Sequence, residues 1–239
     1  MSQSDSSSTE NIFHISHSSI KNLAGSGSIY DNEGIGGADK QNSPTSARQP
    51  KAPTVRTILF LAANPKDTAQ LRLDEEVREI DASLQRARGR DQFVLQQRWA
   101  VRSRDVQRAM LDFRPQIVHF SGHGAEEGLV LEDKTGKAKF VDTEGLAGLF
   151  KSFSDCVECV VLNACYSEVQ ADAIARHIPY VIGMNKAIGD KAAIEFAVSL
   201  YDALGVGESV EFAYKFGCSN IRMAGIPEHL TPVLKKKSS

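Results

Sequence analysis

The chain has 239 residues, enough for one domain with a sizeable core, and its formal net charge is −2 with a sequence pI near 6.3. This charge balance gives no electrostatic footprint for nucleic acid, and no apolar run is long enough to span a membrane. The chain opens without a signal-peptide pattern, and its four cysteines do not suggest a disulfide framework. We therefore expect a cytoplasmic protein in a reducing compartment.

The first 54 residues are rich in serine and glycine and poor in large apolar side chains. Such a segment cannot bury enough apolar surface to offset its ordering entropy, so we expect residues 1–54 to be disordered. Residues 12–29 show a loosely strand-like pattern, which makes them either a docking peptide for another protein's sheet edge or part of an unstructured leader. At the other end, residues 234–239 are expected to form a solvated basic tail.

Strands and helices alternate from Thr57 onward. The stretch TILFLAA (57–63) is a continuous apolar run, typical of a strand covered on both faces. The periodicity then predicts a helix over 73–87, opened by a capping box of Asp67 and Gln70. A strand at 92–100, a helix over 103–113 with Ser103 as N-cap, and a strand at 116–122 follow.

The second half continues this alternation. Residues 128–141 predict a β-hairpin that turns at 134–136, followed by a short helix from Asp142. Strands are expected at 159–164 and 179–184, with a helix between them capped by Ser167 and Gln170, and two helices over 190–204 and 208–222. Repeated strand–helix units require parallel strands with helices on both faces. The predicted fold is a three-layer α/β domain over 55–233, with a mainly parallel sheet and a small hairpin beside it.

Two reactive side chains follow predicted strands. His123 comes directly after the strand 116–122, and Cys165 directly after the strand 159–164. Because the carboxyl ends of parallel strands meet at one edge of a sheet, we expect both residues at the same rim. A cysteine thiolate attacks carbonyl carbons, and a nearby imidazole favours the thiolate and protonates the leaving amine. This arrangement predicts a His–Cys catalytic dyad.

Small residues surround both positions. Gly122 and Gly124 flank the histidine, where the absence of a side chain lets a substrate backbone approach and leaves a main-chain N–H facing a developing oxyanion. The N–H of Cys165 is a candidate second donor.

A zinc site is the main competing interpretation. His119 with His123, and Cys156 with Cys159, supply suitable ligand types. However, His119 lies inside an apolar strand, and only one CxxC pair is present where a structural site usually shows two. We therefore expect no metal and no other cofactor.

The motifs HFSGHG (119–124) and VVLNACYS (160–167), followed in order by the run 180–217, resemble the CHAT domain, a bacterial relative of caspases and separase among the cysteine peptidases. The resemblance covers roughly 56–232. It implies that His123 is the family's histidine, that Cys165 is the nucleophile, and that the amides of Gly124 and Cys165 are the oxyanion donors. It also implies peptide-bond hydrolysis without a metal or cofactor.

Asp190, in the loop after the strand 179–184, has two interpretations. It either shapes the primary specificity pocket and receives a basic or polar group, or it caps the following helix.

Two functions follow from these patterns. In the first, the chain is a regulated cysteine endopeptidase that cleaves a partner protein in bacterial signalling, programmed death or antiphage defence, as the resemblance implies. A separate sensor or activator would then contact residues 12–29, since the chain shows no sensor repeat. In the second, the chain is a non-catalytic adaptor that has kept the fold. The oligomeric state stays open.

Overall fold

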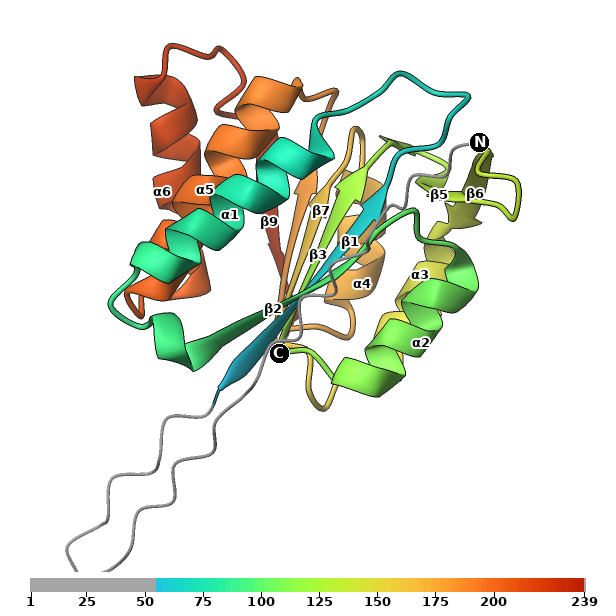
Figure 1. Ribbon diagram of the computed structural model, residues 1–239, viewed down its shortest axis with the longest axis horizontal. Helices are drawn as coiled ribbons and strands as arrows, with labels where there is room; N and C mark the ends of the chain where they lie inside the picture. Colours follow the sequence, from blue (N-terminus) through green and yellow to red (C-terminus); the bar gives the residue numbers. More distant parts are fainter. Residues whose placement is uncertain (1–54, 239) are drawn as a thin grey trace, which may run out of the picture. The chain divides into compact units, whose positions relative to one another are not determined.

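Residues 55–238 are described by the computed structural model, in which six strands form the central sheet (Figure 1). In spatial order they are β2 (Phe93–Arg98), β1 (Arg56–Ala63), β3 (Ile117–Gly122), β7 (Cys159–Asn163), β8 (Tyr180–Met184) and β9 (Pro232–Lys236). The first five run parallel, and β9 pairs antiparallel with β8. The segment 1–54, including the candidate docking peptide 12–29, lies outside the described residues.

The central strands are buried on both faces. Along β1, Ile58 and Phe60 pack on one side of the sheet, whereas Leu59 and Leu61 pack on the other. All four side chains are at most 2% exposed. This two-sided burial explains why the strand is a continuous apolar run rather than an alternating one.

Helices cover both faces, which confirms the predicted three layers (Figure 1). One face carries α1 (Leu73–Arg86), α5 (Asp190–Gly205) and α6 (Val210–Met223). The other carries α2 (Ser103–Phe113), α3 (Thr143–Lys151) and α4 (Glu168–Ala175). A short 3-10 helix, η1 (Arg90–Gln92), precedes β2.

The predicted hairpin is confirmed and belongs to a small separate sheet. Strands β5 (Gly128–Glu132) and β6 (Ala138–Asp142) pair antiparallel, with Gly136 in the turn at φ +76°. A two-residue strand, β4 (Gly124–Ala125), extends this sheet and begins one residue after His123.

The basic tail was predicted wrongly in part, because β9 reaches Lys236. The Nζ atom of Lys235 donates to Glu168 at 2.8 Å and to Asp172 at 3.1 Å, both on α4. Lys236 pairs with Glu211 of α6 at 3.0 Å. Backbone pairing with β8 and these carboxylates place both lysines on the sheet edge, where composition alone indicated a solvated end.

The predicted helix caps also need correction. Helix α1 starts after Arg72, five residues beyond the predicted cap Asp67. The carboxylate of Asp67 instead accepts a hydrogen bond from the amide of Ala138 at 2.8 Å. Gln70 donates to the carbonyl of Pro65, and Ser103 is the first helical residue of α2 rather than its cap.

Ser167 does occupy the N-cap position of α4, but its hydroxyl bridges two strands. It donates to the Leu162 carbonyl and accepts from the Met184 amide. The side chain of Gln170 donates to the carbonyl of Glu126. The polar side chains that the local pattern predicted as helix caps thus form hydrogen bonds with other parts of the fold.

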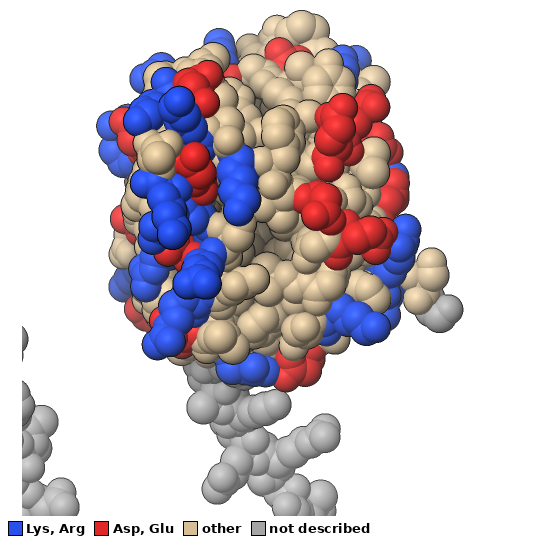
Figure 2. Space-filling view, turned by 90° about the vertical axis from the view of Figure 1, so that its right-hand side faces the viewer, with Lys and Arg blue, Asp and Glu red and all other residues tan. Residues whose placement is uncertain are grey.

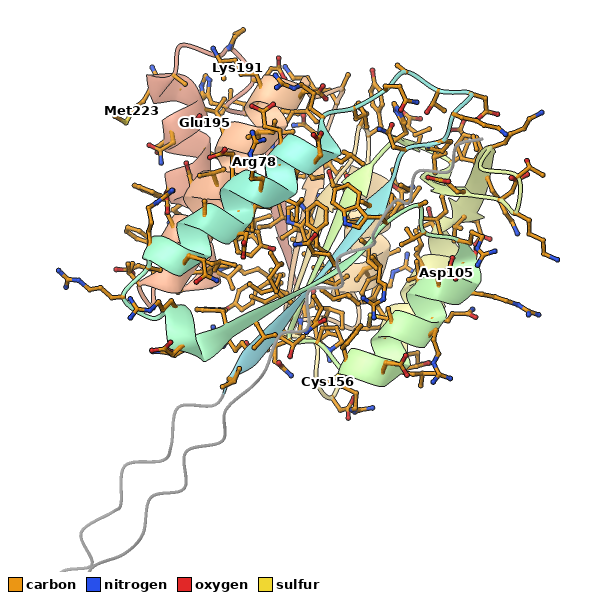
Figure 3. All side chains as sticks on the ribbon, viewed as in Figure 1. Arg78, Asp105, Cys156, Lys191, Glu195 and Met223 are labelled. Carbon is orange, nitrogen blue, oxygen red and sulfur yellow. The ribbon has the colours of Figure 1, made fainter. Side chains whose placement is uncertain are left out.

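Charged side chains of both signs lie on the face shown in Figure 2, with Lys and Arg gathered along one edge and Asp and Glu along the other. Figure 3 shows Met223 at the end of α6, where it is 82% exposed. Within residues 55–238, no helix combines the length and apolar character needed to cross a membrane.

Candidate active site

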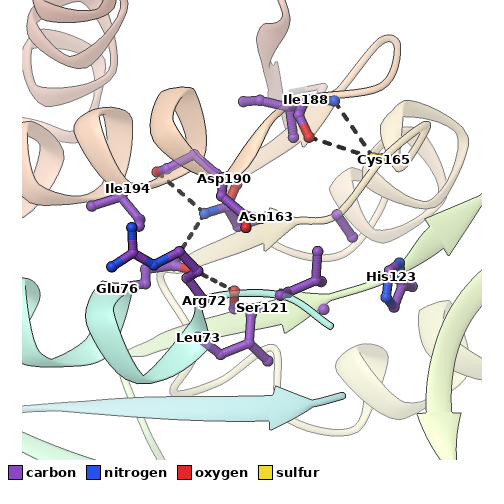
Figure 4. A pocket seen from close by; sticks show the side chains of 14 residues that line it. Arg72, Leu73, Glu76, Ser121, His123, Asn163, Cys165, Ile188, Asp190 and Ile194 are labelled. Carbon is purple, nitrogen blue, oxygen red and sulfur yellow. Dashed lines mark hydrogen bonds between the residues drawn. The ribbon is translucent and has the colours of Figure 1, made fainter. Parts of the chain in front are cut away.

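The two predicted dyad residues line one cavity at the carboxyl end of the sheet (Figure 4). Strands β3 and β7 are parallel neighbours, with Ser121 opposite Asn163 in the register. His123 follows the end of β3, and Cys165 follows the end of β7. The sheet topology therefore brings together two residues that are far apart in the sequence, at the rim where parallel sheets bind ligands.

The imidazole of His123 is held by a main-chain carbonyl. Its Nε2 lies 2.7 Å from the carbonyl oxygen of Ala69, in the loop that precedes α1. A carbonyl can only accept, so Nε2 carries the proton in this contact. In the neutral ring, Nδ1 then keeps its lone pair and is able to accept a proton.

The thiol of Cys165 is half-buried against the loop between β8 and α5. Its Sγ lies 3.5 Å from the amide nitrogen of Ile188 and 3.8 Å from the Ile188 carbonyl oxygen. The following residue, Tyr166, has φ +56°, a left-handed conformation that is unusual for a bulky side chain. Tyr166 lies between β7 and α4, and non-glycine residues in this conformation are common at functional sites.

The other thiols lie in less reactive surroundings. Burial raises the pKa of Cys159 to about 12 and that of Cys218 to about 11. Burial also raises the pKa of Cys156, which lies near the opposite end of the sheet (Figure 3). Among the four cysteines, only Cys165 lines the cavity.

Gly122 and Gly124 have a packing role. A Cβ atom on Gly122 would lie 2.7 Å from the Ala63 carbonyl oxygen, and one on Gly124 would lie 2.6 Å from that of Cys165. Both separations are too short for a side chain, so these glycines allow the chain after β3 to approach β1 and the cysteine loop. Their service to a substrate or an oxyanion stays a prediction.

Asp190 lines the same cavity as His123 and Cys165. It is the first residue of α5, whereas Gly189 occupies the N-cap position and no side chain among the residues that the structure describes caps the helix. The interpretation of Asp190 as a helix cap was therefore wrong. Its location agrees with the alternative of a pocket residue.

A buried polar cluster beneath the cavity was not predicted. We call Glu76, His119, Ser121, Asn163 and Tyr201 the Glu76 cluster. Glu76 is 2% exposed; its Oε1 accepts from His119 Nε2 at 2.9 Å and from Asn163 Nδ2 at 2.7 Å, and its Oε2 accepts from the Ser121 hydroxyl. His119 Nδ1 lies 3.1 Å from the Tyr201 hydroxyl, and desolvation raises the pKa of Tyr201 well above its usual value. Hydrogen bonding thus compensates the burial of this carboxylate.

The sequence did contain a signal for this cluster. Glu76 stands on the apolar stripe of α1, three residues after Leu73 and four before Ile80, where a solvated carboxylate is not expected. His119 likewise interrupts a buried strand. A carboxylate and an imidazole that both face the core need hydrogen-bond partners, so the sequence could have predicted that Glu76 and His119 pair with each other.

The two histidines of the suggested zinc motif face different surroundings. His119 is fully buried on Glu76 and Tyr201, whereas His123 lines the cavity. Throughout residues 55–238, no three His, Cys, Asp or Glu side chains are grouped closely enough to hold a metal ion.

Comparison with known proteins agrees with this architecture. The family model described as the CHAT domain matches residues 31–213. A protein of Gillisia limnaea named "Probable protease" is 26% identical over an alignment of 202 residues, which covers 77% of this chain and 36% of that protein. The chain thus spans little more than a third of the length of this relative.

Three solved cysteine peptidases have similar structures. A secreted C11 cysteine protease from Bacteroides thetaiotaomicron, in complex with an irreversible peptide inhibitor, gives a TM-score of 0.56 at 15% identity, covering 77% of this chain and 66% of that one. The Arg-specific gingipain R gives 0.53 at 12%, covering 76% and 46%. Caspase-1 from Spodoptera frugiperda gives 0.50 at 12%, covering 83% and 98%. At these identities the likeness concerns the fold, which is caspase-like. Since the family model matches more than half of its length, the chain belongs to the CHAT domain family.

Proposed function

We propose that the chain is a cysteine endopeptidase in which Cys165 is the nucleophile and His123 the general base and acid. One observation carries this proposal: both side chains line the same cavity, at the carboxyl ends of adjacent parallel strands. The contact of His123 with the Ala69 carbonyl supports it further, because it orients the ring and leaves Nδ1 as the proton acceptor.

In the proposed reaction, His123 takes the thiol proton and the Cys165 sulfur attacks the carbonyl carbon of the scissile bond. The carbonyl oxygen becomes an oxyanion, which the amides of Gly124 and Cys165 are proposed to stabilise. Collapse of this intermediate breaks the C–N bond, and His123 gives its proton to the leaving amine. Water, activated by His123, then hydrolyses the thioester and restores the thiol. The step needs no metal or other cofactor.

Asp190 is proposed to line the pocket for the residue that precedes the cut. It shares the cavity with the dyad and does not cap α5. The test is an Asp190→Ala variant, whose preference among cleavage sites should change; an unchanged preference would count against the assignment.

The biological substrate is proposed to be a partner protein, cleaved in the reducing cytoplasm as part of bacterial signalling, programmed death or antiphage defence. Family membership supports this role, together with the name of the Gillisia limnaea relative. An uncontrolled intracellular peptidase is harmful, so we also propose a separate activator that contacts residues 12–29. Deletion of residues 1–50 should abolish activation or partner binding.

The decisive experiment compares the purified chain with its Cys165→Ala variant on a diverse peptide library, with and without lysate of the host, with cleavage read by mass spectrometry. Cuts that require Cys165 are expected. Cuts that appear only with lysate would identify a latent enzyme and its need for an activator. If neither condition gives Cys165-dependent cuts, and Cys165→Ala leaves the biological output unchanged, the adaptor function replaces the peptidase.

A further inference from the structure

The carbonyl that holds His123 belongs to an exposed loop. Residues 64–72 join β1 to α1 and run over the carboxyl end of the sheet (Figure 1). Ala69, whose carbonyl oxygen lies 2.7 Å from His123 Nε2, is exposed, as is the neighbouring Gln70. Burial of apolar side chains therefore does not determine where this carbonyl lies. Its position depends on the hydrogen bonds that shape the loop and attach it to the fold.

The two ends of this loop are joined by one side chain, that of Asn64. Its Nδ2 donates to the Leu71 carbonyl oxygen at 3.1 Å, and its Oδ1 accepts from the Leu71 amide at 3.2 Å. The pair also fixes the orientation of the carboxamide, because a flipped amide would set oxygen against the carbonyl and nitrogen against the amide. We call these two hydrogen bonds the Asn64 clamp. Ala69 lies inside the segment that the clamp closes.

The β5–β6 hairpin holds the same loop from outside. The amide of Ala138 donates to the Asp67 carboxylate at 2.8 Å, and a main-chain hydrogen bond of 3.0 Å joins the loop to the hairpin turn. The hairpin also holds the main chain of the histidine, because the Val130 amide donates to the His123 carbonyl oxygen at 3.0 Å. Both members of the contact between His123 and Ala69 thus share one support, and the Asn64 clamp sets the shape of the loop between them.

We propose that Asn64 is a positioning residue of the active site, which closes the loop and thereby keeps the Ala69 carbonyl against His123 Nε2. The inference rests on the proposed peptidase function. The ring then keeps its proton on Nε2 and presents the lone pair of Nδ1, which takes the proton of the Cys165 thiol. Without the clamp the loop has several conformations and the carbonyl leaves the ring, so the productive tautomer is populated for only part of the time.

Gln116 offers a matched control at the opposite end of the sheet. It precedes β3, whereas His123 follows the carboxyl end of that strand. Its Oε1 accepts from the Thr57 amide at 2.8 Å, and its Nε2 donates to the Arg114 carbonyl oxygen at 3.1 Å. Like Asn64, it is a half-buried carboxamide with both polar atoms bonded to the main chain. Gln116→Ala therefore removes the same chemical group and the same kind of hydrogen bonds, far from the dyad.

The first test measures kcat and KM of the full chain and of both variants, on the peptide whose Cys165-dependent cleavage is fastest. Asn64→Ala should lower kcat by about 10²-fold, the cost of displacing a catalytic group by about 1 Å, and change KM by about threefold or less. Gln116→Ala should keep kcat, and urea titration measures the stability of both variants. Equal losses of kcat in the two variants, or a higher KM at unchanged kcat in Asn64→Ala, would contradict the proposal.

Asn64→Asp covers the case in which Asn64→Ala does not fold. The carboxylate has nearly the shape of the amide and still accepts from the Leu71 amide, but it cannot donate to the Leu71 carbonyl oxygen, so half of the clamp is lost. We expect kcat to fall in this variant as well. An unchanged kcat would overturn the proposal.

A spectroscopic measurement separates failure of this inference from failure of the peptidase, because it needs no substrate. In the isotope-labelled full chain at about pH 8, where a free imidazole is neutral, NMR correlations between ring protons and ring nitrogens report which nitrogen carries the proton. The signals of His123 are those that His123→Ala removes. The unmodified chain should carry the proton on Nε2, and Asn64→Ala should show a mixture of both tautomers. If no peptide is cleaved, this difference still supports the positioning role of Asn64. An Nε2 tautomer that is absent from the unmodified chain, or unchanged in Asn64→Ala, overturns it.

Discussion

Strand β3 contains one histidine, His119, and is followed by a second, His123. Strand β7 likewise contains Cys159 and is followed by Cys165. His119 is fully buried, with both ring nitrogens within 3.1 Å of a partner, whereas His123 is only partly buried and, within residues 55–238, its ring has one hydrogen-bond contact, the Ala69 carbonyl. Cys159 is 1% exposed and burial raises its pKa to about 12, whereas Cys165 is half-buried and lines the cavity.

This comparison shows that position along a parallel strand decides the chemistry of an otherwise identical group. Inside the strand the side chain is enclosed between sheet and helices, so it must pair or stay neutral. Beyond the carboxyl end the chain turns away, and the group lies where loops converge. The following predictions test this difference, from the largest expected effect to the smallest.

The cysteine pair should differ most. Cys165→Ala should lower peptidase kcat/KM by at least about 10³-fold, because no other thiol lines the cavity. Cys159→Ala should keep the activity and lower the free energy of unfolding by about 1 kcal/mol, as expected for a small side chain lost from the core. Equal activity losses in the two variants would contradict the assignment.

The histidine pair should separate activity from stability. His123→Ala should reduce kcat by about 10²–10⁴-fold, the usual contribution of general acid–base catalysis. His119→Phe should instead lower the free energy of unfolding by about 1–3 kcal/mol, because Glu76 loses a donor while buried. Urea titration measures the stability of both variants. A His123→Ala variant that keeps full activity would rule out its role as base.

Alkylation of the intact chain by iodoacetamide should distinguish the thiols. At pH 8, modification of Cys165 should exceed that of Cys159 by about 100-fold, since Cys159 is inaccessible and its thiolate is scarce. Mass spectrometry of digested samples taken over time measures the extent of modification at each cysteine.

The raised pKa of Cys159 also gives a pH dependence of stability. Above about pH 8.5, the ordinary pKa of a free thiol, the unfolded chain releases the Cys159 proton while the folded chain retains it. The contribution of this thiol to stability is therefore complete below that pH and falls as the pH rises toward 12. Removal of the side chain in Cys159→Ala should weaken this alkaline loss.

Alanine substitutions of two glycines, Gly124 beside His123 and Gly148 in α3, should have the smallest effects. Gly124→Ala should lower the free energy of unfolding by about 1–3 kcal/mol, because its Cβ would lie 2.6 Å from the Cys165 carbonyl oxygen. Gly148→Ala is the matched control within α3: no atom of the described part of the chain lies within 4 Å of the position that its Cβ would take, and the change should stabilise the helix by about 0.5–1 kcal/mol. Thermal unfolding measures both. A neutral Gly124→Ala would show that the loop yields.

Most of the sheet and the positions of His123 and Cys165 were predictable from the sequence. Continuous apolar runs identified strands such as β1 and β7, and helical periodicity identified α1 and α5, because the spacing of apolar residues along a segment reflects which of its faces are buried. The ends of two such runs were enough to locate the two proposed dyad residues on one rim. The short antiparallel strand β9 was not predicted, because its lysines are typical of a solvated terminus.

What the tertiary structure alone decided is which polar group meets which. Asp67 bonds to Ala138 rather than capping a helix, Ser167 joins two strands, and Glu76 collects hydrogen bonds from β3 and β7. A hydrogen bond depends on distances of a few tenths of an ångström between segments remote in sequence, and no periodic pattern encodes them. Apolar burial, by contrast, needs only a side chain of the right kind at the right spacing. For this reason the sequence determined the layers and the rim, whereas only the folded chain determined the polar cluster beneath the cavity.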